Sequence, residues 1–192
     1  MSKSRFYRRL DARRAMLMAT PFIAVFAAQK GYATDYNPTD LSSLRAALIA
    51  SNAAGTNDRI FLPAGTITLD AGTLDNANAS GDLDITKASG SLEIIGAGQT
   101  TTILDGNGLD RVFHVNAATS VDIHDLTIRN GLASDDGSST GTALGGGILH
   151  VGAGVLTLNT VTITQTEARA QAGAQDDARG GNGPSGTGGS AG

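Results

Sequence analysis

The chain of 192 residues has room for one domain of ordinary size with flanking segments, which excludes a large multidomain enzyme. It contains no cysteine and no tryptophan, so disulfide scaffolds, thiolate metal sites and cysteine nucleophiles are excluded as well. Seven of the fourteen basic residues lie within the first thirty positions, whereas the chain from Thr34 onward carries seven basic and seventeen acidic residues, about −10. We therefore expect no nucleic-acid partner.

The N-terminal segment is typical of an export signal. Residues 1–14 are basic, and residues 15–28 form an apolar run, the order found in secretory signal peptides. We predict a signal peptide over residues 1–33, cleaved after Ala33, with a site after Ala27 or Ala28 as the alternative. The paired arginines Arg13 and Arg14 match a twin-arginine signal only loosely, so the choice between the general and the twin-arginine export route stays open.

A permanent membrane anchor is the other interpretation of this segment. A transmembrane helix needs about 20 apolar residues, and the run is shorter than that and contains Pro21. We therefore expect no stable transmembrane helix after cleavage, and an exported protein located outside the cell, on its surface or in the periplasm.

Residues 34–58 are expected to form a capping helix segment. Leu41, Leu44, Leu48 and Ile49 recur at helical spacing, behind the N-cap candidates Thr39 and Asp40. These features predict one amphipathic helix over residues 41–53, which would cover the N-terminal end of the following structure.

Residues 59–167 read as short β-branched strands separated by Gly, Asn and Asp. Residues 83–94, 113–128 and 149–163 align as copies of one strand-turn-strand unit. Phe113 then corresponds to Leu149, and His114 to His150. Such self-similarity favours a β-solenoid over a sandwich or a barrel.

The alternation within these strands predicts which side chains point into the solenoid and stack in ladders. The expected inward residues are Leu83, Ile85, Leu92, Ile94, Ile103, Phe113, Val115, Val121, Ile123, Leu126, Ile128, Leu149, Val151, Leu156, Leu158, Val161 and Ile163. Residues 168–192 are rich in glycine and lack large apolar side chains, so we predict a disordered tail there and an uncovered last coil.

Several of these segments resemble a family of exported surface proteins. The order of Ser42-Ser43-Leu44-Arg45-Ala46-Ala47, DRIFLPAGTITL (58–69), LEIIGAGQTTTILDGNGLDRVFHV (92–115) and DLTIRNG (125–131) is similar to that of the CSLREA-type proteins, found among polymorphic outer-membrane and autotransporter-like proteins. Ser42 and Ala46 stand where that motif has cysteine and glutamate. The resemblance implies an all-β fold, a right-handed parallel β-helix with an N-terminal capping α-helix.

The leading functional hypothesis is a secreted or cell-surface module with a structural or adhesive role, either an elongated surface module or the N-terminal part of a larger passenger protein. Its expected partners are extracellular polysaccharides or components of a host or cell surface. A nonfunctional fragment of a longer reading frame is a further alternative.

Parallel β-helices also include polysaccharide lyases and glycoside hydrolases of the pectin-degrading type, so an enzyme is the alternative. Its candidate catalytic residues are Asp122, His124 and Asp125, because Asp122 and His124 would project from the same outer face of one strand. The equivalent positions of the next copy are Thr157, Asn159 and Thr160, which favours simple polar decoration. No cofactor is predicted. Asp135 and Asp136 are the candidate calcium ligands, although Asp-Gly pairs are first of all turn formers.

Overall fold

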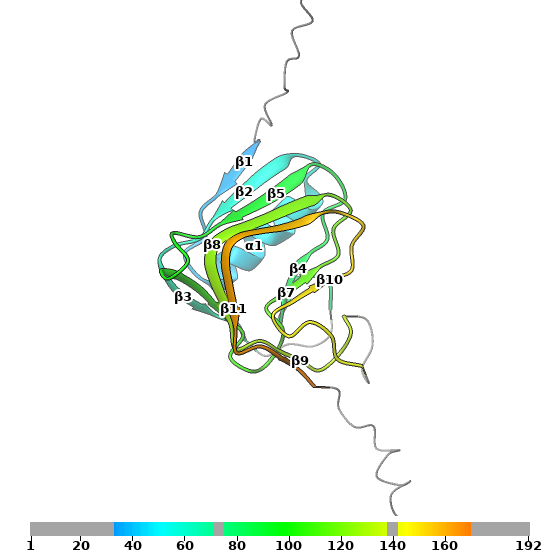
Figure 1. Cartoon of the computed structure of the whole chain (residues 1–192). Coiled ribbons are helices and arrows are strands. Elements are labelled where there is room, and N and C mark those ends of the chain that lie inside the picture. The colour runs from blue at the N-terminus through cyan, green and yellow to red at the C-terminus, as the bar shows by residue number, and fades with distance from the viewer. Residues whose placement is uncertain (1–32, 71–74, 138–141, 170–192) are drawn as a thin grey trace, which may run out of the picture.

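The computed structural model describes residues 33–70, 75–137 and 142–169. Strands make up 42% and helix 10% of this part of the chain, and all of its strand pairings are parallel. The sheets curl into a half-barrel around a common core (Figure 1). The predicted all-β class is thus confirmed. Apart from Ala33 and residues 168–169, the predicted signal peptide and tail lie outside the described residues.

The elements in chain order are β1 (Thr34–Tyr36), α1 (Leu41–Ala53), β2 (Asn57–Phe61), β3 (Gly65–Thr68), β4 (Leu83–Ile85), β5 (Ser91–Ile95), β6 (Thr102–Asp105), β7 (Phe113–Val115), β8 (Ser120–Arg129), β9 (Leu132–Ala133), β10 (Ile148–His150), β11 (Leu156–Thr164) and β12 (Glu167–Ala168). The largest sheet has the order β1-β2-β5-β8-β6-β3, with β11 also paired to β8. A second sheet has the order β10-β7-β4, and β9 pairs with β12.

Strand β8 bends in the middle, and the bend joins two parts of the largest sheet. Asp125 has a φ of 58°, in the left-handed region, and separates the half of β8 that pairs with β5 from the half that pairs with β6. Thr160 has a φ of 53° at the corresponding place in β11. Both strands therefore turn the same corner, and β11 follows β8 along its whole length.

The observed register agrees with the predicted alignment at most positions and corrects it at one. Leu83 lies opposite Phe113, and Val121 lies opposite Leu156, as expected. Phe113, however, pairs with Ile148 and not with Leu149. The prediction that His114 and His150 occupy equivalent positions is consequently wrong. His114 lies opposite Leu149, so the predicted inward position of Leu149 is wrong, and Ile148 packs against the core in its place. The shift by one residue also places His150 on the other face.

The core consists of ladders of apolar side chains from successive strands. One ladder contains Ile60, Ile94 and Ile123, which lie opposite one another in β2, β5 and β8 and are fully buried. A second contains Ile67, Leu104 and Ile128, so the predicted inward position of Ile103 is wrong by one residue. Ile103 lies opposite Thr127 on the outer side.

The predicted helix is confirmed over its full length. The Asp40 carboxylate accepts a hydrogen bond from the Ser43 backbone N–H at 2.8 Å, and the Ser43 hydroxyl accepts one from the Asp40 N–H, which forms a capping box. Leu44 and Leu48 are buried in the core, whereas Ile49 is 49% exposed and does not belong to the buried face.

Helix α1 covers the edge of β4 through one side chain. Asn52 Nδ2 donates to the Asp84 carbonyl at 2.9 Å, and Asn52 Oδ1 accepts from the Thr86 N–H at 3.0 Å. The Asn52 amide thus supplies one donor and one acceptor, in place of the backbone N–H and C=O of a neighbouring strand. The helix therefore satisfies backbone groups on a strand edge that would otherwise be open to pairing with another chain.

A buried ion pair fastens the end of this helix to the sheet. The ammonium of Lys87 lies 2.9 Å from Asp58 Oδ2 and also donates to the carbonyls of Ser51 and Ala54 near the C-terminus of α1. Both charged side chains are fully buried. Burial by itself raises the pKa of Asp58, but the hydrogen bond from Lys87 and those from two hydroxyls outweigh it and hold that pKa below its ordinary value.

The opposite end of the stack is exposed. Leu158 and Ile163 in β11 lie opposite the fully buried Ile123 and Ile128, yet they are 42% and 44% exposed. Val151, which was expected to be inward, is 52% exposed. In the described part of the chain, no further strand pairs with the outer edge of β11. No helix among the described residues is long and apolar enough to cross a membrane.

Candidate functional site

The predicted residues Asp122, His124 and Asp125 lie on the outer side of β8. Asp122 and His124 alternate with the buried Val121 and Ile123, so they share the outer face as expected. Asp125 occupies the bend that follows. Its carboxylate lies 2.8 Å from Nδ1 of His124.

Glu93 joins this group from the neighbouring strand, and the sequence analysis had not included it. Its carboxylate lies 3.1 Å from Nε2 of His124, so the imidazole is held between two acidic groups. Glu93 also lies directly opposite Asp122 in the register of β5 and β8. Partial burial disfavours the charged imidazole, but the hydrogen bonds to Asp125 and Glu93 outweigh it and raise the pKa of His124 above its ordinary value.

Glu93, Asp122 and His124 line a groove of about 420 Å³ on the outer face of the largest sheet. Its walls are Glu93, Asp122, Ile123, His124, Thr157 and Asn159. Two carboxylates and an imidazole in one groove could transfer protons to and from a bound molecule. The groove is open and has an acidic character.

The calcium candidates lie elsewhere. Asp135 is buried beside β9, where its carboxylate forms a short ion pair with Arg111 and accepts a hydrogen bond from the Gly137 N–H at 2.8 Å. Asp136 is partly exposed and forms an interaction of its own. The Asp135 carboxylate thus already has two partners.

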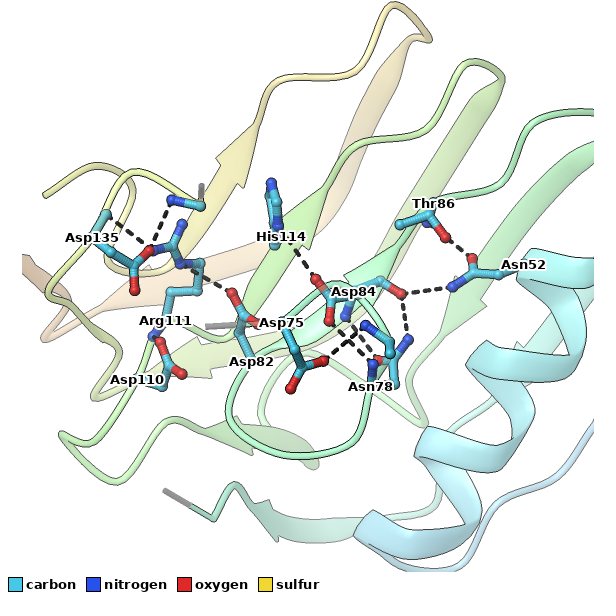
Figure 2. Close-up of polar contacts among 12 residues, drawn as sticks. Asn52, Asp75, Asn78, Asp82, Asp84, Thr86, Asp110, Arg111, His114 and Asp135 are labelled. Carbon is cyan, nitrogen blue, oxygen red and sulfur yellow. Dashed lines mark hydrogen bonds and ion pairs between the residues drawn. The ribbon is translucent and has the colours of Figure 1, made fainter. Parts of the chain in front are cut away.

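A second group of ionisable side chains, most of them buried, lies on the outer side of the β4–β7 sheet (Figure 2). We call it the β4–β7 cluster. It consists of Asp82, Asp84, Asp110, Arg111, His114 and Asp135. The segment before β4 supplies Asp82, and β4 and β7 supply Asp84 and His114, which lie opposite each other in register. The chain between β6 and β7 supplies Asp110 and Arg111.

Arg111 forms two ion pairs in this cluster and is fully buried. Its Nε lies 3.1 Å from Asp82 Oδ2, and its Nη2 pairs with Asp135 and also donates to the Asp135 carbonyl at 3.0 Å. A buried guanidinium remains charged, so it requires such partners. Arg111 thereby links the segment before β4 to the segment after β9.

The cluster contains four carboxylates for one arginine, and this imbalance affects Asp82 most. Burial and the negative charges of Asp84, Asp110 and Asp135 raise the pKa of Asp82 to about 8, against the opposing effect of Arg111. Burial also raises the pKa of Asp110.

Asp84 and His114 face each other within the cluster. Asp84 Oδ1 lies 3.3 Å from Nδ1 of His114, and Asp84 is fully buried. This oxygen has no hydrogen-bond partner in the described structure, and neither does Nε2 of His114. Gly137, with a φ of 85°, covers the ring, and a Cβ placed there would lie 2.9 Å from Nε2.

The sequence analysis missed this cluster, although a signal was present. The alignment of residues 83–85 with 113–115 already placed Asp84 opposite His114. Alternation with the inward residues Leu83, Ile85, Phe113 and Val115 places both side chains on the outer face, where solvent exposure would be expected. The segments around 75–82 and 131–137 cover that face in the structure, and strand alternation cannot predict such coverage.

Comparison with known proteins finds no family model, no curated protein and no solved structure that matches the chain. The arguments for its function therefore depend on its own residues.

Proposed function

We propose that the chain is an exported right-handed parallel β-helix module with a structural or adhesive role at the cell surface, of the CSLREA type. The observation that carries this proposal is the order of strand pairing. Strands that recur along the chain pair in register, with partners separated by 34, 29 and 35 residues from Asp58 through Leu92 and Val121 to Leu156. Each interval is the length of one coil in this interpretation.

Two further features support it. β4, β7 and β10 form a second stack in the same chain order, as successive coils of one solenoid would. About 98% of crossovers between parallel strands of one sheet are right-handed, which favours that hand here. The apolar ladder on the outer side of β11, in the last coil, is exposed, whereas helix α1 covers the first coil. We therefore propose that a further coil of a longer passenger packs on β11.

Because the chain has no cysteine, pairs of introduced cysteines can test the stacking order. Thr127 lies opposite Thr162 in adjacent strands, whereas Thr66 pairs with the more distant Ile103. We expect Thr127→Cys/Thr162→Cys to oxidise to an intramolecular disulfide and the control Thr66→Cys/Thr162→Cys to remain reduced. Crosslinking of the control pair would contradict the proposed coil order.

The surface role needs a separate experiment on the producing cells. An antibody against residues 35–165 should detect a product that protease removes from intact cells, and deletion of residues 15–28 should keep that product inside. A product that stays in the cytoplasm with residues 15–28 present would overturn the proposal. A surface product larger than this chain is the result expected of a passenger.

The outer groove supports one alternative, a polysaccharide lyase or glycoside hydrolase. The specific observation is that Glu93 adds a carboxylate to Asp122 and His124 in one groove. Purified protein would be incubated with uronate-containing and neutral polysaccharides, with and without calcium. Turnover that is abolished by alanine at Asp122, His124 and Asp125 together would favour the enzyme, whereas the structural proposal predicts no turnover.

A further inference from the structure

The β4–β7 cluster contains four carboxylates and one arginine, and that arginine pairs with carboxylates other than Asp84. Arg111 pairs with Asp82 and Asp135, so no arginine or lysine reaches Asp84 among the contacts of the described residues. Buried carboxylates in proteins are normally paired with cations or coordinate metal ions. A cation at Asp84 would remove the imbalance.

We propose that Asp82, Asp84 and His114 bind one divalent first-row transition ion, such as Zn²⁺ or Mn²⁺, that links β4 to β7. One ligand atom from each residue lies within 4.8 Å of the others, and all three residues are buried. Ligands that share one Zn²⁺ at about 2.0–2.2 Å lie roughly 3–4 Å apart. Small side-chain rotations would therefore bring the three atoms to coordinating distance.

The unpartnered carboxylate oxygen of Asp84 is the independent observation that points to a ligand. Asp84 Oδ1 is buried, accepts no hydrogen bond and faces His114. The rest of this residue is held in place, because its Oδ2 accepts from the Asn78 N–H at 3.2 Å and its carbonyl accepts from Asn78 Nδ2 at 2.7 Å. A fixed carboxylate whose Oδ1 accepts no hydrogen bond and lies 3.3 Å from His114 Nδ1 is suited to coordinate an ion together with that imidazole.

The ligand set favours a transition ion over calcium or magnesium. Calcium takes six to eight oxygen ligands, and magnesium keeps several waters in an octahedral shell. Here the ligands are two carboxylates and one imidazole in a buried site, a combination that suits Zn²⁺ or Mn²⁺. The buried position also indicates a structural ion, which fastens the segment before β4 to β7.

The test uses the full chain, freed of metal with EDTA and titrated with Co²⁺ as a spectroscopic substitute for Zn²⁺. We expect one equivalent to bind with a visible d–d absorption, and Zn²⁺ to displace it and raise the melting temperature. Asp84→Asn and His114→Gln should each weaken binding at least tenfold. Asp122→Asn and His124→Gln are matched controls on the outer face of β8 and should bind as the unmodified chain does.

Failure of the unmodified chain to bind Co²⁺ or Zn²⁺, or unchanged binding by folded His114→Gln, would overturn the proposal. So would Ca²⁺ binding of equal strength. If a variant does not fold, Mn²⁺ added to the ¹⁵N-labelled, unmodified chain gives an independent result. Paramagnetic broadening should centre on the amides of residues 83–85 and 113–115. Broadening centred on residues 93 and 122–124 would instead place the ion in the outer groove and refute the proposed site.

Discussion

The exposed outer ladder of β11 can be tested with two isoleucines that differ mainly in coverage. Ile128 in β8 and Ile163 in β11 lie opposite each other in adjacent strands. Ile128 is fully buried between β6 and β11, whereas Ile163 is 44% exposed. The two substitutions Ile128→Ala and Ile163→Ala therefore remove the same atoms from a covered and an uncovered position of one ladder.

The two substitutions are expected to lower the free energy of unfolding by different amounts. Each substitution removes three carbons, worth about 0.8 kcal/mol per buried methylene, or roughly 2.4 kcal/mol at a fully buried site. At Ile128 the enclosing neighbours leave a cavity, which brings the expected loss to about 3–4 kcal/mol. Ile163 is already about half exposed to solvent, so its substitution loses only about half of the burial free energy and leaves no closed cavity. We therefore expect the free energy of unfolding to fall by about 1 kcal/mol.

Urea unfolding followed by far-UV circular dichroism measures both losses. With an m-value of about 1.5 kcal/mol per M, the midpoint should fall by roughly 2–2.7 M for Ile128→Ala and by about 0.7 M for Ile163→Ala. Unchanged m-values would show that the compactness of the two end states is preserved. Equal losses at the two positions would refute the reasoning, because they would mean that Ile163 is covered as completely as Ile128.

Three other predictions follow from the described contacts. Lys87→Met should cost about 3–5 kcal/mol in urea unfolding, because it leaves Asp58 buried without its cation, and Asp58→Leu added to it should recover much of the loss; a double variant no more stable than the single one would contradict this. Thr160→Gly should raise the stability by about 1 kcal/mol, because a β-branched residue is strained at a φ of 53°, and an unchanged melting temperature would show that the strain is absent. The pKa of folded His124 lies above its ordinary value of 6.5, so its stabilising contribution is present in full below that pH and is lost as the pH rises through the folded pKa. Urea unfolding between about pH 6 and pH 8 should show a larger loss in the unmodified chain than in His124→Gln, because the raised pKa of Asp82 lowers the stability of both as the pH rises. Parallel pH profiles would contradict the prediction for His124.

Part of each candidate site could be predicted from the sequence, and part could not. It placed Asp122 and His124 correctly on one face, because strand alternation alone fixes that relation. It missed Glu93, which reaches His124 only through the pairing of β5 with β8. It also interpreted His114 as an outward side chain, although the segment ending at Gly137 covers it.

Local patterns by themselves determined the strands, the helix over residues 41–53 and most of the buried ladder, because alternation and capping depend on neighbouring residues. Only the tertiary structure decided the register of β10, since a single-residue shift leaves the apolar pattern of Ile148 and Leu149 almost equally good in sequence. Tertiary packing also decided which outward side chains are covered. Asp84 is buried beside His114 because segments distant in the sequence fold over β4 and β7. The residues of the two strands alone do not indicate that such segments will cover them.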